Sequence, residues 1–141
     1  MKTGLVIFLM QILLINGCMS KDNKSSSDYR LNDIWVMQKM TGVELQKEKL
    51  PKGPPTFEFH LLDNRFLCNT GCNSISGEIE ITGNHISFSK VVSTRMFCPD
   101  MEAENAIIKT ISDKTLTYKI ENLKLILEDE KGIKIFLKKV D

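Results

Sequence analysis

The sequence predicts a mainly β domain: a small antiparallel, barrel-like and strongly coiled sheet of about eight strands, with one short α-helix. Three observations support this class. From Ile34 onward, apolar and polar residues alternate in short runs, turn residues separate the runs, and only the segment after Pro99 has a helical period. A single short helix cannot cover so many strands, so the sheet must curl around its own core.

The chain begins with a segment that we exclude from the fold, residues 1–17. Lys2 supplies a positive charge, and Leu5–Ile15 is an apolar run shorter than the roughly 20 residues of a membrane span, as in secretory signals. Ile15-Asn16-Gly17-Cys18 resembles a bacterial lipobox. The Cys18 thiol would then become diacylglyceryl-modified, and its new amino group would receive a further acyl chain such as palmitate. A signal peptide with a chance cysteine is the alternative.

Residues 18–30 are polar and predict a lipidated cysteine followed by a flexible tether, so the folded domain is expected over 31–141. Met19 follows Cys18, where an Asp would favour retention in the inner membrane. This favours a bacterial outer-membrane location. The sequence leaves open whether the domain lies on the periplasmic side or at the cell surface.

Charge excludes one class of partner. Removal of residues 1–17 takes away Lys2 and no acid, which leaves 18 basic and 18 acidic side chains and a formal net charge of zero. A nucleic-acid-binding protein would show a basic excess. No run of Lys or Arg indicates binding to anionic lipid, so we expect attachment to the membrane through the lipid on Cys18 and not through electrostatics.

The first half of the domain predicts strands with a period of two. The first predicted strand begins at Ile34 and ends at Gly42. On one of its sides lie Trp35, Met37 and Lys39. The proline-rich segment 50–55 is a loop, because proline cannot donate to a sheet ladder. The strand 56–62 follows, with an inward set of Phe57, Phe59 and Leu61. The strand 65–72 places on one face Phe66, Cys68, Thr70 and Cys72.

The second half predicts a hairpin, a helix and three strands. Gly83-Asn84 forms the turn between strands 78–81 and 86–88. Asp100 is the expected helix cap, with Glu102 and Glu104 favourable near the positive end of the helix dipole. The helix has an apolar stripe of Ile107, Ile108 and Ile111. The last strands, 115–120, 123–127 and 133–140, carry the inward sets Leu116/Tyr118/Ile120, Leu123/Leu125/Leu127 and Ile133/Ile135/Leu137.

Three cysteines remain in the exported domain, where disulfides persist: Cys68, Cys72 and Cys98. In an extended strand, Cys68 and Cys72 would lie about 13 Å apart, whereas bridged Cα atoms lie within about 7 Å. The two cannot pair, and either could face Cys98. A metal site that also used His60 and His85 would lack the tight paired spacing of zinc modules, so no metal and no cofactor are expected.

Three segments resemble the META domain family of HslJ-like bacterial lipoproteins. They are Trp35-Val36-Met37-Gln38-Lys39-Met40-Thr41-Gly42, Gly71-Cys72-Asn73-Ser74-Ile75-Ser76-Gly77 and Thr94-Arg95-Met96-Phe97-Cys98. The resemblance covers residues 31–140 and implies a small barrel-like β domain with a helix, lipid-anchored in the envelope. Associations with heat shock, antibiotic tolerance, motility or secretion have been suggested for the family, and no reaction or ligand is established for it. Cys68 departs from the family pattern, which usually has Gly there.

The resemblance favours a structural disulfide between Cys72 and Cys98, with the pair Cys68–Cys98 and a reduced or metal-bound site as alternatives. Cys68 would then be a spare thiol, either buried and inert or redox-active. Arg95 is expected to pair with an acid or a carbonyl cluster, or to belong to a recognition surface. Asn73 and Thr94 are expected to satisfy backbone groups. Structural or recognition roles are also expected for the other motif residues Trp35, Gly71, Gly77 and Met96.

No catalytic residues are expected. The sequence has no Gly-x-Ser-x-Gly, no phosphate-binding glycine loop and no His-Glu-x-x-His. We therefore expect a non-enzymatic, lipid-anchored envelope protein that contacts an unknown envelope protein in envelope stress or maintenance. The alternatives are a lipocalin-like barrel that binds a small apolar ligand and, third, a thiol redox protein.

Overall fold

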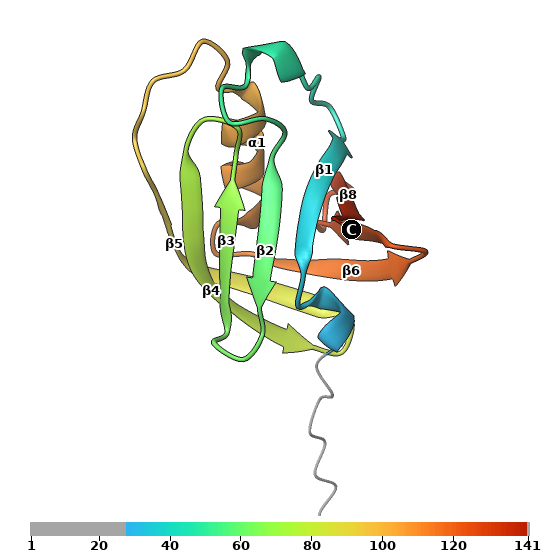
Figure 1. Cartoon of the computed structure of the whole chain (residues 1–141). Helices are drawn as coiled ribbons and strands as arrows, with labels where there is room; N and C mark the ends of the chain where they lie inside the picture. Colours follow the sequence, from blue (N-terminus) through green and yellow to red (C-terminus); the bar gives the residue numbers. More distant parts are fainter. Residues whose placement is uncertain (1–27, 141) are drawn as a thin grey trace, which may run out of the picture.

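A computed structural model describes residues 28–140, in which eight antiparallel strands form a closed barrel in sequence order (Figure 1). The strands are β1 (Ile34–Met40), β2 (Thr56–His60), β3 (Arg65–Asn69), β4 (Ser74–Thr82), β5 (His85–Ser93), β6 (Thr115–Glu121), β7 (Lys124–Glu128) and β8 (Lys134–Lys139). One helix, α1 (Glu102–Ile111), and two 3-10 turns, η1 (Tyr29–Leu31) and η2 (Lys47–Lys49), complete the described chain. The predicted fold class is confirmed. The predicted signal peptide, residues 1–17, and most of the predicted tether with Cys18 lie outside the described residues.

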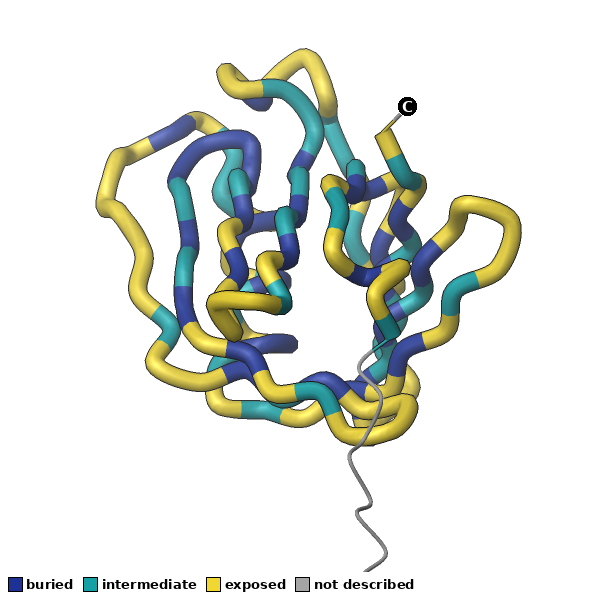
Figure 2. Tube along the Cα trace, turned by 60° about the horizontal axis from the view of Figure 1, so that its bottom comes forward, coloured by how far each residue is buried: buried dark blue, intermediate teal, exposed yellow. Residues whose placement is uncertain are grey.

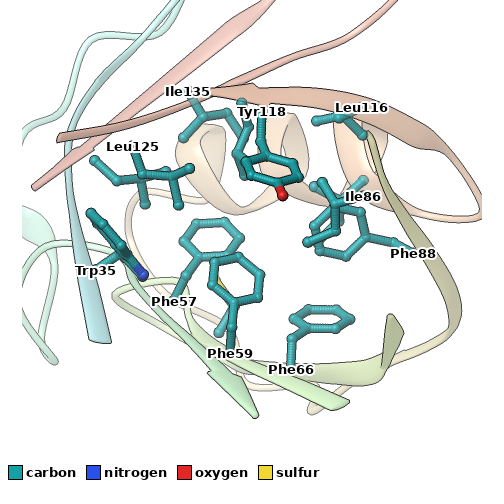
Figure 3. Close-up of a cluster of buried hydrophobic side chains, with 14 of the residues drawn as sticks. Trp35, Phe57, Phe59, Phe66, Ile86, Phe88, Leu116, Tyr118, Leu125 and Ile135 are labelled. Atoms are coloured by element: carbon teal, nitrogen blue, oxygen red, sulfur yellow. The ribbon is translucent and has the colours of Figure 1, made fainter. Parts of the chain in front are cut away.

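Side chains fill the interior of the barrel. Buried and exposed positions alternate along the strands, as Figure 2 shows. The inward-facing residues include Phe57, Phe59, Phe66 and Phe88, and the rings of Phe66 and Phe88 meet edge to face with centroids 5.0 Å apart (Figure 3). Aromatic residues bury large apolar areas, so this cluster supplies much of the hydrophobic stabilisation.

The two ends of the barrel are closed by different elements. Ile107 and Ile111 of α1 are fully buried and belong to the core at one end, and Leu31 of η1 is buried near the other end (Figure 1). The indole N–H of Trp35 donates a hydrogen bond to the Leu31 carbonyl at 3.1 Å, which fixes η1 on the core. Within residues 28–140, no helix has the length and apolar character that a membrane crossing requires.

Four predicted details of the strands and the helix are wrong. A bulge in β1 between Met37 and Lys39 shifts the register, so Met40 is buried and Lys39 exposed. Strand β3 ends at Asn69, and Thr70 to Asn73 form a turn. Leu123 has a φ of 61° in the β6–β7 turn and is exposed, so it does not belong to the inward set. Met101, not Asp100, is the N-cap of α1, although the Asp100 carboxylate accepts a hydrogen bond from Glu102 N–H at 2.9 Å.

Candidate functional site

The turn between β3 and β4 requires glycine at its centre. Gly71 has a φ of 94°, and a Cβ atom at this position would lie 2.9 Å from the Gly53 carbonyl oxygen and 2.9 Å from Leu50 Cδ2. Only glycine adopts this conformation without strain, and only glycine leaves room for the loop at Leu50–Gly53. The turn therefore packs tightly on that loop and sets the direction in which Cys72 and Asn73 point.

A disulfide joins Cys72 in this turn to Cys98, which precedes α1. The two Cα atoms lie 6.1 Å apart, within the usual range for a bridge, and both side chains are buried. The bond ties the beginning of β4 to the segment 94–101 that connects β5 with α1. Of the two pairings left open by strand geometry, the structure contains the one that the family resemblance favoured.

A buried carboxylate supports the same turn from the helix. Glu104 Oε2 accepts a hydrogen bond from the Thr70 hydroxyl at 2.6 Å and from the Asn73 backbone N–H at 3.1 Å. Glu104 Oε1 accepts from the Asn73 side-chain amide at 2.9 Å. A buried charge is tolerated when it is hydrogen-bonded in this way. Glu104 thus joins α1 to the turn without leaving an unsatisfied oxygen.

Asn73 extends the network to the segment after β5. Its Oδ1 accepts hydrogen bonds from the Thr94 hydroxyl at 2.9 Å and from the Met96 N–H at 2.7 Å. Its Nδ2 group also donates to the Met96 carbonyl at 3.0 Å. Both backbone groups of Met96 are therefore held by one buried side chain, and the full hydrogen-bonding capacity of the Asn73 amide is used.

The segment held by Asn73 and the disulfide, residues 94–98, displays large side chains to solvent. We name it the braced segment. Phe97 is 95% exposed and Met96 48% exposed. Arg95 is exposed and forms no hydrogen bond or ion pair with the described residues, so the expected pairing of Arg95 with an acid or a carbonyl cluster is not found. A guanidinium, a thioether and an aromatic ring are thus exposed at consecutive positions of a backbone that is held at Met96 and Cys98.

The comparison with protein families fits this arrangement, because the sequence profile of the META domain matches residues 29–141 and so includes the turn, the braced segment and α1. The chain belongs to the META domain family. No curated protein matches the chain.

Solved structures show the same fold as this META domain at low sequence identity. A protein from Burkholderia xenovorans, known from an NMR structure, is 17% identical with a TM-score of 0.61, covering 79% of this chain and 85% of its own. A second protein, also known from an NMR structure, is 18% identical with a TM-score of 0.62. The match covers 77% of this chain and 90% of the other chain. A DUF4847 family protein from Bacteroides vulgatus ATCC 8482 is 15% identical with a TM-score of 0.53. The match covers 79% of this chain and 96% of the other chain.

The structure brings most of the META motif residues together, namely Gly71, Cys72, Asn73, Thr94, Arg95, Met96 and Cys98. Trp35 and Gly77 lie elsewhere in the barrel wall. Trp35 belongs to the core, and a Cβ atom on Gly77 would lie 2.7 Å from the Ser89 carbonyl oxygen, so glycine there allows β4 and β5 to approach. These two residues have packing roles.

Cys68 does not belong to the site. It is fully buried in β3, and burial raises the pKa of its thiol far above the usual value, with the negative charge of Glu104 acting in the same direction. A reactive cysteine needs an accessible thiolate. Among residues 28–140, no cluster of three His, Cys, Asp or Glu side chains could hold a metal ion.

Sequence reasoning missed two members of the network, Glu104 and Thr70. A signal for Glu104 is present in the sequence. Glu104 precedes Ile107 by three positions and Ile111 by seven, which places this acid on the apolar stripe that faces the core. A carboxylate on that stripe predicts a buried acid that requires hydrogen-bond donors. The period-two pattern predicts a strand through Thr70, whereas Thr70 lies in the turn that follows β3.

Proposed function

We propose that this protein is a lipid-anchored META-domain protein of the bacterial outer membrane that acts in envelope maintenance or stress by contacting another protein, and that it is not an enzyme. The observation that carries the proposal is the exposure of Phe97, at 95%, on a segment fixed by Asn73 and by the disulfide. The proposed contact surface is the exposed part of the braced segment, Arg95, Met96 and Phe97.

The fixed backbone supports a binding role for these side chains. A partner that binds Phe97 would gain the hydrophobic energy of one phenyl ring, and little chain entropy would be lost because the segment is already ordered. Aromatic residues, Met and Arg are the types enriched at protein interfaces. We expect the partner to offer an apolar pocket for Phe97 with an acidic residue near it for Arg95.

The position of the braced segment supports the same proposal. In Figure 1 the chain after β5, drawn in gold, rises along one side of the barrel to the end where α1 lies, whereas residues 28–31 lie at the opposite end. A lipid on Cys18 would connect to the domain through Asp28. The end of the barrel near α1 would then be the one directed away from the anchoring membrane and toward a partner.

The two other candidate functions have less support. A lipocalin-like site needs space inside the barrel, but the interior holds the four packed phenylalanines together with aliphatic side chains (Figure 3). A thiol redox function would need an accessible Cys68, which is fully buried.

Replacement of Phe97 tests the contact surface. In intact cells, Phe97→Ala should reduce chemical crosslinking of the protein to its partner about thirtyfold, because a central aromatic contact contributes about 2 kcal/mol or more. Mass spectrometry of the crosslinked product measures the loss. Leu62→Ala is the matched control, because Leu62 is 86% exposed in the turn after β2. Equal crosslinking by both variants would argue against the proposed surface.

A second experiment tests the anchor. Metabolic labelling with palmitate should label the protein, and Cys18→Ala should abolish the label and move the protein from the detergent phase to the aqueous phase. Cys68→Ala keeps Cys18 and should remain labelled. If Cys18→Ala still partitioned into detergent, the lipid anchor would have to be abandoned, while the test on Phe97 would keep its meaning.

A further inference from the structure

The closed barrel gathers lysines that are scattered in the sequence. Strands β7 and β8 place Lys124 directly opposite Lys138 on the outer surface. The bulge in β1 turns Lys39 outward opposite Phe136, two residues before Lys138 in β8, and its Nζ lies 4.4 Å from the centre of the Phe136 ring. Three lysines from three strands therefore line the same groove as Phe136, although no basic run exists in the sequence.

These lysines differ from their neighbours in forming no ion pair, although Glu121, which pairs with Lys119, lies opposite Lys124 in the β6–β7 ladder. Near them, ion pairs join Lys119 to Glu121, Lys134 to Glu128 and Lys139 to Asp33. The side chains of Lys124 and Lys138 form no ion pair or hydrogen bond with any residue of the described chain. The Lys39 ammonium contacts the Phe136 ring and forms no ion pair with the described residues. Like charges directly opposite each other in a ladder are destabilising. An external anion would remove this repulsion.

Apolar surface accompanies the positive charge. A groove of about 400 Å³ lies between the lysines and is lined by half-buried Ile126 and Phe136. Three exposed apolar residues lie on β1 or next to the ends of β7 and β8, and backbone hydrogen bonds join their segments: Ile34, Leu123 and Val140. Leu123 O accepts from Lys139 N–H at 2.9 Å, and Ile34 O accepts from Val140 N–H at 3.0 Å.

We propose that this basic face, consisting of Lys39, Lys124 and Lys138 around Phe136 with the apolar edge of Ile34, Leu123 and Val140, docks on a membrane surface that contains anionic phospholipid. The ammonium groups would contact lipid phosphates. The apolar edge would enter the boundary between headgroups and acyl chains, where short apolar side chains and lysines are both favourable.

The position of the basic face favours a bilayer over other anionic partners. Ile34 follows closely on η1, with which the described chain begins, so the basic face adjoins the end from which the tether leaves. Asp28 lies ten positions after Cys18, a stretch that reaches at most about 36 Å when extended, which keeps the face close to the anchoring membrane. The inference rests on the proposed lipid anchor in this respect.

Docking through the basic face leaves the side of the barrel that carries the braced segment accessible. The basic face occupies β7, β8 and β1, whereas the braced segment follows β5 and is bonded to the beginning of β4, about half of the barrel away in strand order. Lipid contact and protein contact would therefore take place on different sides of the barrel and could occur together.

Vesicle flotation tests the inference with the mature chain, residues 18–141, carrying Cys18→Ala so that no lipid is attached. The chain should float with phosphatidylcholine vesicles that contain one third phosphatidylglycerol and should remain below vesicles of phosphatidylcholine alone. Each lysine near an anionic surface contributes about 1 kcal/mol, so the double variant Lys124→Gln/Lys138→Gln should bind about thirtyfold more weakly. High salt should have the same effect on the unaltered face.

The control variant is Lys47→Gln/Lys49→Gln, which removes two exposed lysines from η2 and should bind as the parent does. Thermal unfolding of the double variant on the basic face should occur at the same or a higher temperature, because a like-charge pair is removed. Three results would overturn the inference: no detectable flotation of the parent, equal flotation with both kinds of vesicle, or equal loss in the η2 control. None of them would affect the experiments on Phe97 and Cys18.

Discussion

Asn73→Asp should lower the free energy of unfolding by about 3–5 kcal/mol at neutral pH. The substitution keeps the shape of the side chain but replaces its Nδ2 donor with an oxygen. That atom lies 2.9 Å from Glu104 Oε1 and 3.0 Å from the Met96 carbonyl oxygen, so a carboxylate would face a second carboxylate and a carbonyl in a buried position. Urea denaturation of the purified domain under oxidising conditions measures the change.

The loss should depend on pH in a defined direction. Two adjacent carboxylates share a proton more readily in the folded state than in the unfolded chain, so the variant binds more protons when folded. The loss of unfolding free energy in Asn73→Asp should be complete at a pH above the range in which the shared proton dissociates. The loss should become smaller as the pH falls toward about 4. A loss that is constant with pH would exclude the carboxylate pair as its cause.

Asn105→Asp is the matched control for this experiment. Asn105 is exposed on α1, one residue after Glu104, so the chemical change is the same and takes place in water. Exposed substitutions of this kind change stability by less than about 0.5 kcal/mol. If Asn105→Asp were as damaging as Asn73→Asp, the added charge on the domain, and not the buried network, would explain the result.

Period-two patterning predicts the barrel well because inward positions of a closed sheet must be apolar along every strand. Phe57, Phe59 and Phe66 are buried as this pattern requires. The Gly83-Asn84 turn also lies where its composition places it, between β4 and β5. Both features depend on local sequence, which explains why they can be predicted without the structure.

Features that depend on contacts distant in sequence could not be predicted in the same way. The bulge that turns Lys39 outward is a property of the β1–β8 pairing and has no local signal. Similarly, the exposure of Phe97 results from bonds that Asn73 makes 23 residues away. The motif indicated which residues matter at the site, but only the fold shows that they hold a segment whose side chains face solvent.

The disulfide should contribute about as much to stability as the Asn73 network. The sequence separation of Cys72 and Cys98 is 26 residues, and closing a loop of this size stabilises the folded state by about 3.5 kcal/mol in the chain-entropy account. Cys72→Ser/Cys98→Ser should therefore lower the free energy of unfolding by about that amount, which chemical denaturation measures. Treatment of the parent with a reductant should produce the same loss.

Cys68→Ala provides the comparison for this variant, because it removes a buried sulfur and leaves the bridge intact. It should cost about 1 kcal/mol, as expected for loss of a small buried group, and the reductant should destabilise it as much as it destabilises the parent. If reduction left the parent unchanged, the hydrogen bonds of Asn73 would hold the braced segment without the bridge. Binding through Phe97 would then be independent of the redox state of the envelope, whereas a stabilising bridge would make it sensitive to reduction.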